Sequence, residues 1–148
     1  MYIVDTSTMP LQIIQITGAL DDADLQKMEE GMRWSLATTT PYVCITLARY
    51  SDRPGSQQRK RIAEIAERGR VNKQCLAVAI VVANELVAGA LTAIRWVSPS
   101  PRPEKSFTSA ASALLWLKPF ADNAGLVIAD SARATAIRMD TAQPSANA

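Results

Sequence analysis

The sequence alternates between short apolar stretches and longer amphipathic ones, and this alternation is its strongest constraint on the fold. Strands are predicted where β-branched and other apolar residues run together, at residues 2–4, 11–17, 42–48, 75–83 and 105–108. Helices are predicted where apolar residues recur at helical spacing, with caps at Asp21, Ser56, Asn84 and Ser109. Because most strands are separated by a helix, we expect an α/β fold: a mixed, mostly parallel sheet of about five strands with helices packed against it.

The end of the chain differs in composition from the rest. Pro119 lies inside the last helical pattern and is expected to kink or end that helix. After Gly125 the sequence is rich in Ala, Ser, Thr and Asp, and its periodicity is weak. Residues 127–129 are apolar and fit either a last strand or a docking segment. We therefore expect one domain over residues 1–125 and a C-terminal tail, 126–148, that is weakly structured or docked on a partner.

The residue types present exclude several kinds of site. The chain of 148 residues contains no histidine, which excludes a Ser-His-Asp triad, a Cys-His pair and a histidine-containing zinc site. Its two cysteines, Cys44 and Cys75, lie in predicted strands and are expected to be buried, reduced thiols. The acidic residues of the first helix gather at its start, where they fit capping better than metal binding. We expect no metal, no cofactor and no catalytic residue.

The apolar segments are too short to cross a membrane. The longest, residues 75–97, is interrupted by Asn84 and Glu85, and each uninterrupted part falls well short of the roughly 20 residues that a span needs. The first residues lack the basic and apolar regions of a signal peptide. These features predict a cytoplasmic protein.

Two neighbouring segments carry a resemblance to a known family. Residues 75–82 read as a buried strand, and residues 88–96 read Ala-Gly-Ala-Leu-Thr-Ala-Ile-Arg-Trp. Together with the Pro-rich stretch and the Ala-Leu-Leu-Trp-Leu helix at 113–117, they resemble the SpoIIAA-like (STAS-like) family of small bacterial proteins. That family is related in fold to anti-sigma-factor antagonists and to CRAL-TRIO domains. The resemblance covers roughly residues 10–120 and implies a STAS-like α/β domain, not a particular reaction.

The loop that follows the strand at 42–48 is where the resemblance places a regulatory site. In anti-sigma-factor antagonists with a STAS domain, a serine at this point is phosphorylated by a partner kinase and gates partner binding. The resemblance therefore implies phosphorylation at Ser56, with Ser51 as the second positional match. The residue types alone also fit a purely structural reading, in which Ser56 caps the second helix.

Residues 49–73 form a strongly basic segment. They hold eight basic and three acidic side chains, a net charge of +5 in a chain whose total is +2. We expect Arg53, Arg59, Lys60 and Arg61 to meet an acidic protein, an anionic lipid headgroup or a nucleic-acid backbone. The lack of interleaved aromatic residues argues against nucleic acid, and an anionic membrane surface has no further support. The alternative is a solvated helix face with a Glu64–Arg68 pair.

Small residues distinguish the third predicted helix. Gly89 and Ala93 lie one turn apart, and Trp96 follows beside the Pro-rich loop. Small residues allow another backbone to approach closely, and tryptophan is a frequent interface anchor, so these positions fit a dimer or partner surface. They equally fit close packing of the helix on its own sheet.

These features favour an interaction protein over an enzyme. We expect a non-enzymatic regulatory module of STAS-like fold that binds a protein partner or associates with itself. The alternative is a small-molecule or lipid-binding domain with an apolar pocket under the third helix, suggested by the related CRAL-TRIO lipid carriers. An enzyme that uses carboxylates or the loop with Ser51 and Ser56 would instead require a cleft with paired ionisable groups of perturbed pKa.

Overall fold

The strands form one sheet in sequential order. The computed structural model describes residues 1–86 and 100–142, and its five-stranded sheet has the order β1-β2-β3-β4-β5. The strands are β1 (Tyr2–Asp5), β2 (Leu11–Gly18), β3 (Tyr42–Ser51), β4 (Cys75–Val81) and β5 (Glu104–Phe107). β1 and β2 pair as an antiparallel hairpin at one edge, and all later neighbours pair in parallel. The predicted mixed, mostly parallel sheet is confirmed.

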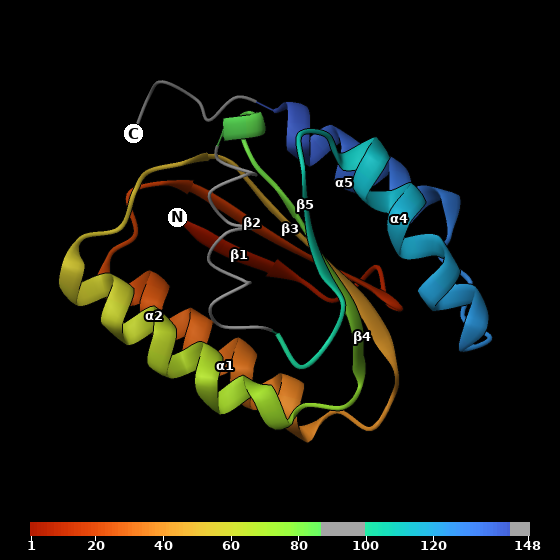
Figure 1. Cartoon of the computed structure of the whole chain (residues 1–148), viewed down its shortest axis with the longest axis horizontal. Helices are drawn as coiled ribbons and strands as arrows, with labels where there is room; N and C mark the ends of the chain where they lie inside the picture. The colour runs from red at the N-terminus through yellow and green to blue at the C-terminus, as the bar shows by residue number, and fades with distance from the viewer. Residues whose placement is uncertain (87–99, 143–148) are drawn as a thin grey trace.

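Helices cover both faces of this sheet (Figure 1). One face carries α1 (Asp22–Ala37) and α2 (Ser56–Arg68), with the short 3-10 helix η1 (Gly69–Val71) following α2. The opposite face carries α4 (Ala110–Asn123), which packs on β3 and β4, and α5 (Asp130–Thr141), which packs on β2 and β3. We call the face with α1 and α2 the cavity face and the face with α4 and α5 the core face.

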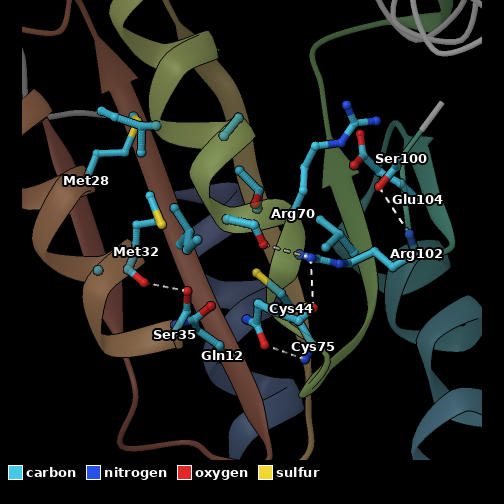
Figure 2. Close-up of a pocket in the computed structure, with 18 of the residues that line it drawn as sticks. Gln12, Met28, Met32, Ser35, Cys44, Arg70, Cys75, Ser100, Arg102 and Glu104 are labelled. Atoms are coloured by element: carbon cyan, nitrogen blue, oxygen red, sulfur yellow. Dashed lines mark hydrogen bonds between the residues drawn. The ribbon is translucent and has the colours of Figure 1, made fainter. Parts of the chain in front are cut away.

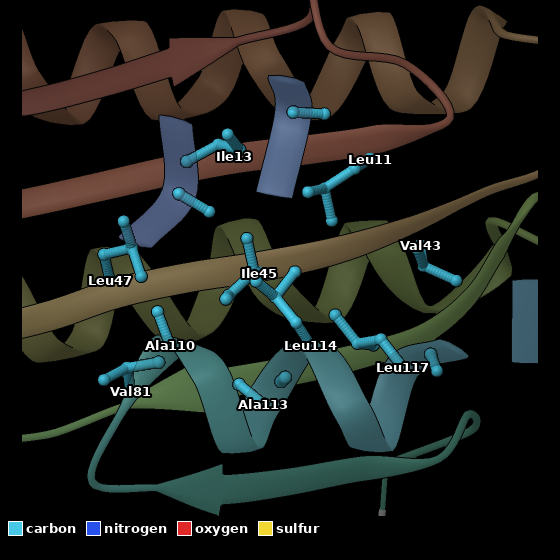
Figure 3. Packing of buried hydrophobic residues seen from close by; sticks show 14 of the residues in the cluster. Leu11, Ile13, Val43, Ile45, Leu47, Val81, Ala110, Ala113, Leu114 and Leu117 are labelled. Carbon is cyan, nitrogen blue, oxygen red and sulfur yellow. The ribbon is translucent and has the colours of Figure 1, made fainter. Parts of the chain in front are cut away.

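The core face holds the larger hydrophobic cluster (Figure 3). Alternate side chains of β2, β3 and β4 point toward it and are completely buried, as are side chains of α4 that meet them: Leu11, Ile13, Val43, Ile45, Val81, Ala113 and Leu117. Burial of this apolar surface stabilises the folded state by about 25 cal/mol per Å². α4 and α5 therefore cover the core face of β2, β3 and β4.

Local sequence signals fix most of the helix starts. Asp21 caps α1 by accepting from the Asp24 N–H at 2.8 Å, and the Asp24 carboxylate accepts in return from the Asp21 N–H at 3.3 Å. Ser109 caps α4 through the Ser112 N–H at 3.2 Å. The predicted cap of α2 is wrong, because Gly55 is the N-cap and Ser56 is the first helical residue. The Gly55 N–H donates to Gln58 Oε1 at 3.1 Å.

Pro119 does not end α4, which was one of the two expectations for it. The helix continues to Asn123 and then terminates at Gly125, whose φ of 70° is in the left-handed region. The Leu126 N–H donates to the Ala121 carbonyl at 2.9 Å, and the Gly125 N–H donates to the Asp122 carbonyl at 3.0 Å. These two bonds satisfy the last carbonyls of the helix, so glycine, not proline, sets its end.

The expectation of a weakly structured tail is wrong for residues 130–141. They form α5, whose Ala132 and Ala136 are buried in the main core. The small alanine side chains let the helix lie close to the sheet despite a weak apolar periodicity. Residues 127–129 form no strand. Ile128 packs against the core, which fits the docking segment that was the other expectation.

Part of the predicted third helix, with Gly89, Ala93 and Trp96, lies outside the described residues. The same holds for the end of the tail, residues 143–148. The apolar pocket that was expected under this helix therefore also falls outside the described residues.

Candidate functional site

A cavity of about 550 Å³ lies between the sheet and the α1–α2 pair. On this side of the sheet α1 packs on β1, and α2 packs on α1 and η1. Met28 and Met32 of α1 form one wall, and β2 and β3 form the floor (Figure 2). The residues of the second wall come from α2: Ile62, Ala63, Ile65 and Ala66.

The floor of the cavity carries both polar and apolar side chains. Gln12 of β2 lies beside Cys44 of β3, and Ile14 lies beside Thr46, because β2 and β3 pair in this register. Only 5% of Gln12 is exposed, yet within the described part of the chain its side chain makes no hydrogen bond. No fully enclosed side-chain nitrogen or oxygen in that part lacks a partner, so the Gln12 amide must face the cavity itself.

One end of the cavity is closed by a side-chain network around Arg102. The Arg102 guanidinium donates to the carbonyls of Gly69 and Asn72, both at 3.1 Å (Figure 2). The Asn72 amide donates to the Tyr42 hydroxyl at 2.9 Å. Arg102 thereby ties the segment before β5 to the chain that links α2 and β4.

The two thiols lie on this side of the sheet, as free, buried cysteines. This confirms the sequence prediction for Cys44 and Cys75. Burial, and then the neighbouring Cys75, raise the pKa of the Cys44 thiol. Burial also raises the pKa of Cys75, although the Arg102 guanidinium opposes that shift. Both thiols therefore stay protonated near neutral pH and are weak nucleophiles.

The residues predicted to bind a partner from α2 and its preceding loop do not form one uniform surface. Arg61 is half-buried and pairs with Glu29 at 3.5 Å and with Asp22 at 3.7 Å, so it joins α2 to α1. Arg59 is exposed and donates to the Pro54 carbonyl at 2.8 Å. Arg53 and Lys60 are exposed and make no ion pair within the described ranges. We call Arg53, Arg59 and Lys60 the basic edge of α2.

The Glu64–Arg68 pair that was the alternative reading of this helix is not formed by the side chains. Arg68 instead pairs with Glu29 of α1 at 3.4 Å, and its Nε is 3.5 Å from the Glu64 carbonyl oxygen. Glu29 thus forms ion pairs with both Arg61 and Arg68. Two of the eight basic residues of segment 49–73, Arg61 and Arg68, therefore hold α1 and α2 together.

The two candidate serines differ in their surroundings. Ser51 is the last residue of β3, and its hydroxyl donates to the Ala48 carbonyl at 2.8 Å. Ser56 is exposed at the first position of α2, and its side chain has no capping bond. The structural reading of Ser56 as a cap is therefore excluded, and its hydroxyl is open to solvent beside the basic edge.

A buried ion pair that the sequence did not predict connects β3 to α5. Arg49 donates to both carboxylate oxygens of Asp140, at 3.0 and 2.8 Å, and to the Thr108 carbonyl at 2.6 Å. Asp140 also accepts from the Ala110 N–H at 3.0 Å. The bonds to Asp140 raise the pKa of Arg49. The sequence predicts that this strand ends at residue 48, but β3 extends through Arg49, which has a structural role.

Residues 1–86 and 100–142 contain neither a candidate metal site nor a candidate membrane-spanning helix. No group of His, Cys, Asp or Glu side chains there could hold a metal ion. None of the helices there has the length and apolar character needed to span a membrane.

Comparisons with known proteins agree on the fold. No protein-family model matches the sequence, and no curated protein matches it. An uncharacterised protein of the DUF3478 family with a SpoIIAA-like fold, from Shewanella loihica PV-4, is similar in structure, with a TM-score of 0.63 and 22% identity. The match covers 79% of this chain and 92% of that one. An anti-sigma factor antagonist from Mycobacterium paratuberculosis matches with a TM-score of 0.50 and 15% identity over 80% of this chain and 93% of that one.

These likenesses define the class of fold. The chain has a STAS-like (SpoIIAA-like) fold, as the sequence resemblance implied. Sequence reasoning missed the cavity on the α1–α2 side. A partial signal was present: Cys44 and Thr46 are two residues apart on one predicted strand, which places them on the same face of the sheet.

Proposed function

We propose that this chain is a non-enzymatic regulatory module that binds a protein partner through the basic edge of α2. The observation that supports this proposal best is the pair Arg53 and Lys60, which are exposed, lack an internal partner in the described residues and lie near the open Ser56. Unpaired surface charges attract and steer a partner of opposite sign. We therefore expect the partner to present an acidic surface.

The fold supports a regulatory role of this kind. The Mycobacterium paratuberculosis protein that shares it is an anti-sigma factor antagonist, a regulator by its own description. The likeness favours this function over a lipid carrier. Arg61 belongs less to the proposed surface, because its ion pairs to α1 must break before it can bind a partner.

Ser56 is the position at which this surface would be regulated. A phosphate there would lie at the N-terminus of α2, where the helix dipole and free N–H groups favour negative charge. It would also add a charge of about −1.5 to −2 beside Arg53 and Arg59. Phosphorylation would therefore weaken binding of an acidic partner. Ser51 is the second candidate, but its hydroxyl already donates to a backbone carbonyl.

The binding proposal is tested with immobilised protein and quantitative mass spectrometry of what it retains from cells of its source. The test variant is Arg53→Glu/Lys60→Glu, and the matched control is Lys73→Glu/Arg138→Glu, which makes the same charge change on exposed residues elsewhere. We expect a partner that the wild type and the control retain and the test variant retains roughly tenfold less. Equal retention by all three proteins would contradict the proposal.

Self-association is the second way in which such a module could act. Gly89, Ala93 and Trp96 are the residues proposed for that contact. Light scattering on the wild type and on Trp96→Ala distinguishes the two modes. A concentration-dependent dimer that the variant loses would support self-association, and a strict monomer would leave the basic edge as the proposed surface.

A further inference from the structure

We propose that the cavity between α1, α2 and the sheet is a binding site for a small amphipathic carboxylate, whose polar head contacts Gln12 and Arg102 and whose apolar part contacts the wall of α1. This is a small-molecule site in addition to the proposed partner surface. It uses residues of the sheet interior that the basic edge does not include.

The buried Gln12 amide is the observation that points to a ligand. Its side chain is 95% removed from solvent, lies on a central strand and makes no hydrogen bond in the described part of the chain. A primary amide has two N–H donors and an acceptor oxygen, so the Gln12 side chain offers hydrogen bonds to a guest in the cavity. A carboxylate oxygen in the cavity would accept from the Gln12 Nε2 and satisfy the amide.

Gln15, three positions further along the same strand, is a glutamine with a structural role and can be compared with Gln12. Its side chain points to the core face, and Nε2 donates to the Met139 carbonyl of α5 at 3.1 Å. The two glutamines have the same chemistry and nearly the same strand position. One is paired by the protein, and the other is left facing an open cavity.

The cavity has the size and lining of a ligand pocket. Its 550 Å³ volume falls inside the range of about 300 to 1,000 Å³ that small-molecule sites occupy. Met28 and Met32 line it from α1, and methionine side chains adapt to the shape of an apolar guest. Ile14 and Val78 add apolar surface on the floor.

The charged groups at the Arg102 end favour an anion. Arg102 donates only to neutral carbonyls and makes no ion pair in the described residues, so its positive charge remains uncompensated there. Among the described residues, the other charged side chains that line the cavity are Arg70, Glu67 and Glu104. Arg70 and Glu67 already pair at 3.0 Å, and Glu104 has a partner of its own. Arg102 is therefore the cation available to a carboxylate head.

The test uses octanoate, octanol and octylamine, which share one chain and differ in the charge of the head group. Each is titrated into ¹⁵N-labelled full-length protein, and amide shifts are followed by NMR. We expect saturable shifts with octanoate at residues of β2, β3 and α1, and binding of octylamine at least about tenfold weaker. Equal or tighter binding of octylamine would overturn the assignment of an anionic ligand, and the absence of saturable shifts with octanoate would overturn the site.

Two variants locate the binding. Gln12→Leu replaces the unpaired amide by an apolar group of similar size, so the protein should fold as well as the wild type while its Kd for octanoate rises by about tenfold. Gln15→Leu is the matched control on the same strand, and it should leave the Kd unchanged although it removes a hydrogen bond to α5. If Gln12→Leu binds octanoate as the wild type does, or if both variants lose binding equally, the proposed role of Gln12 is wrong.

Discussion

The core face and the cavity face of the sheet are made by the same strands but are packed differently. On the core face, two polar side chains of the strands are paired by the protein: Arg49 meets Asp140, and Gln15 meets the Met139 carbonyl. On the cavity face, Gln12 faces open space. Because side chains alternate along a strand, each strand can carry one pattern for stability and another for binding. In this protein the residues that stabilise the fold lie on one face of the sheet and the candidate binding residues lie on the other, although both sets come from the same strands.

The largest expected effect tests this separation with two truncations. Leu117→Ala on the core face should lower the free energy of unfolding by about 3 to 5 kcal/mol, because it opens a new cavity in close-packed surroundings. Met32→Ala on the cavity face should cost only about 1 kcal/mol, because its side chain already borders open space. Urea unfolding followed by circular dichroism measures both. Similar losses in the two variants would show that the cavity face is packed as tightly as the core face.

A pair of charge deletions extends the comparison to ion pairs. Asp140→Asn leaves the Arg49 guanidinium without its counter-charge, and we expect a loss of about 2 to 3 kcal/mol. Glu29→Gln removes the acceptor of Arg61 and Arg68, whose pairs are largely solvated, and should cost about 0 to 1 kcal/mol. The same unfolding measurement applies. A larger loss in Glu29→Gln would place the more important ion pair on the cavity side.

The pH dependence of stability gives a third contrast, at Asp24 of α1. Burial raises the pKa of this carboxyl, but hydrogen bonds from the Tyr2 and Asp21 N–H groups outweigh it and the net pKa is lowered. A lowered folded pKa contributes stability that is present above the unfolded value of 3.8 and is lost as the pH falls through the folded value. Unfolding of Asp24→Asn should therefore change less between pH 7 and pH 3 than unfolding of the wild type or of Asp22→Asn. An unchanged acid dependence in Asp24→Asn would contradict this role.

The smallest expected effect is a gain. Gly31 lies inside α1 and faces the cavity side, where an added Cβ would lie 3.7 Å from Val4 and 3.8 Å from the Tyr2 hydroxyl, which are ordinary contacts. Gly31→Ala should therefore raise stability by about 0.5 to 1 kcal/mol, because alanine loses less backbone freedom in a helix. The thermal midpoint should rise accordingly. A fall would show that this side of the sheet has no room for one more methyl group.

Much of the fold could be predicted from the sequence because the strands and caps carry local signals. The apolar runs of β2, β3 and β4 and the capping residues Asp21 and Ser109 are each visible within a few positions. α5 could not be predicted in this way. It is held by alanines and by an ion pair to Arg49, 91 positions earlier, and neither produces a periodic apolar pattern.

The candidate site was less predictable for a related reason. The charge of the segment 49–73 was plain, but only the fold shows that Arg61 and Arg68 are used internally while Arg53 and Lys60 are free for a partner. The cavity depends on the position of α2 relative to the sheet, which the sequence does not give. The sequence also does not show that Gln12 is buried without a hydrogen-bond partner in the described residues. Sequence patterns show which side of a strand or helix faces the core and which residue caps a helix. A binding site depends on how elements that are distant in the sequence pack together.

The junction around Arg49 has a consequence for the order in which this chain folds. Its guanidinium joins the end of β3 to the start of α4, through Thr108, and to Asp140 of α5. Contacts of such long sequence separation form only after the segments between them have been organised, because closing a long loop costs entropy first. α5 should therefore be the last element to dock and the first to open. Hydrogen exchange in its amides should be faster than in β3, although both belong to the same buried core.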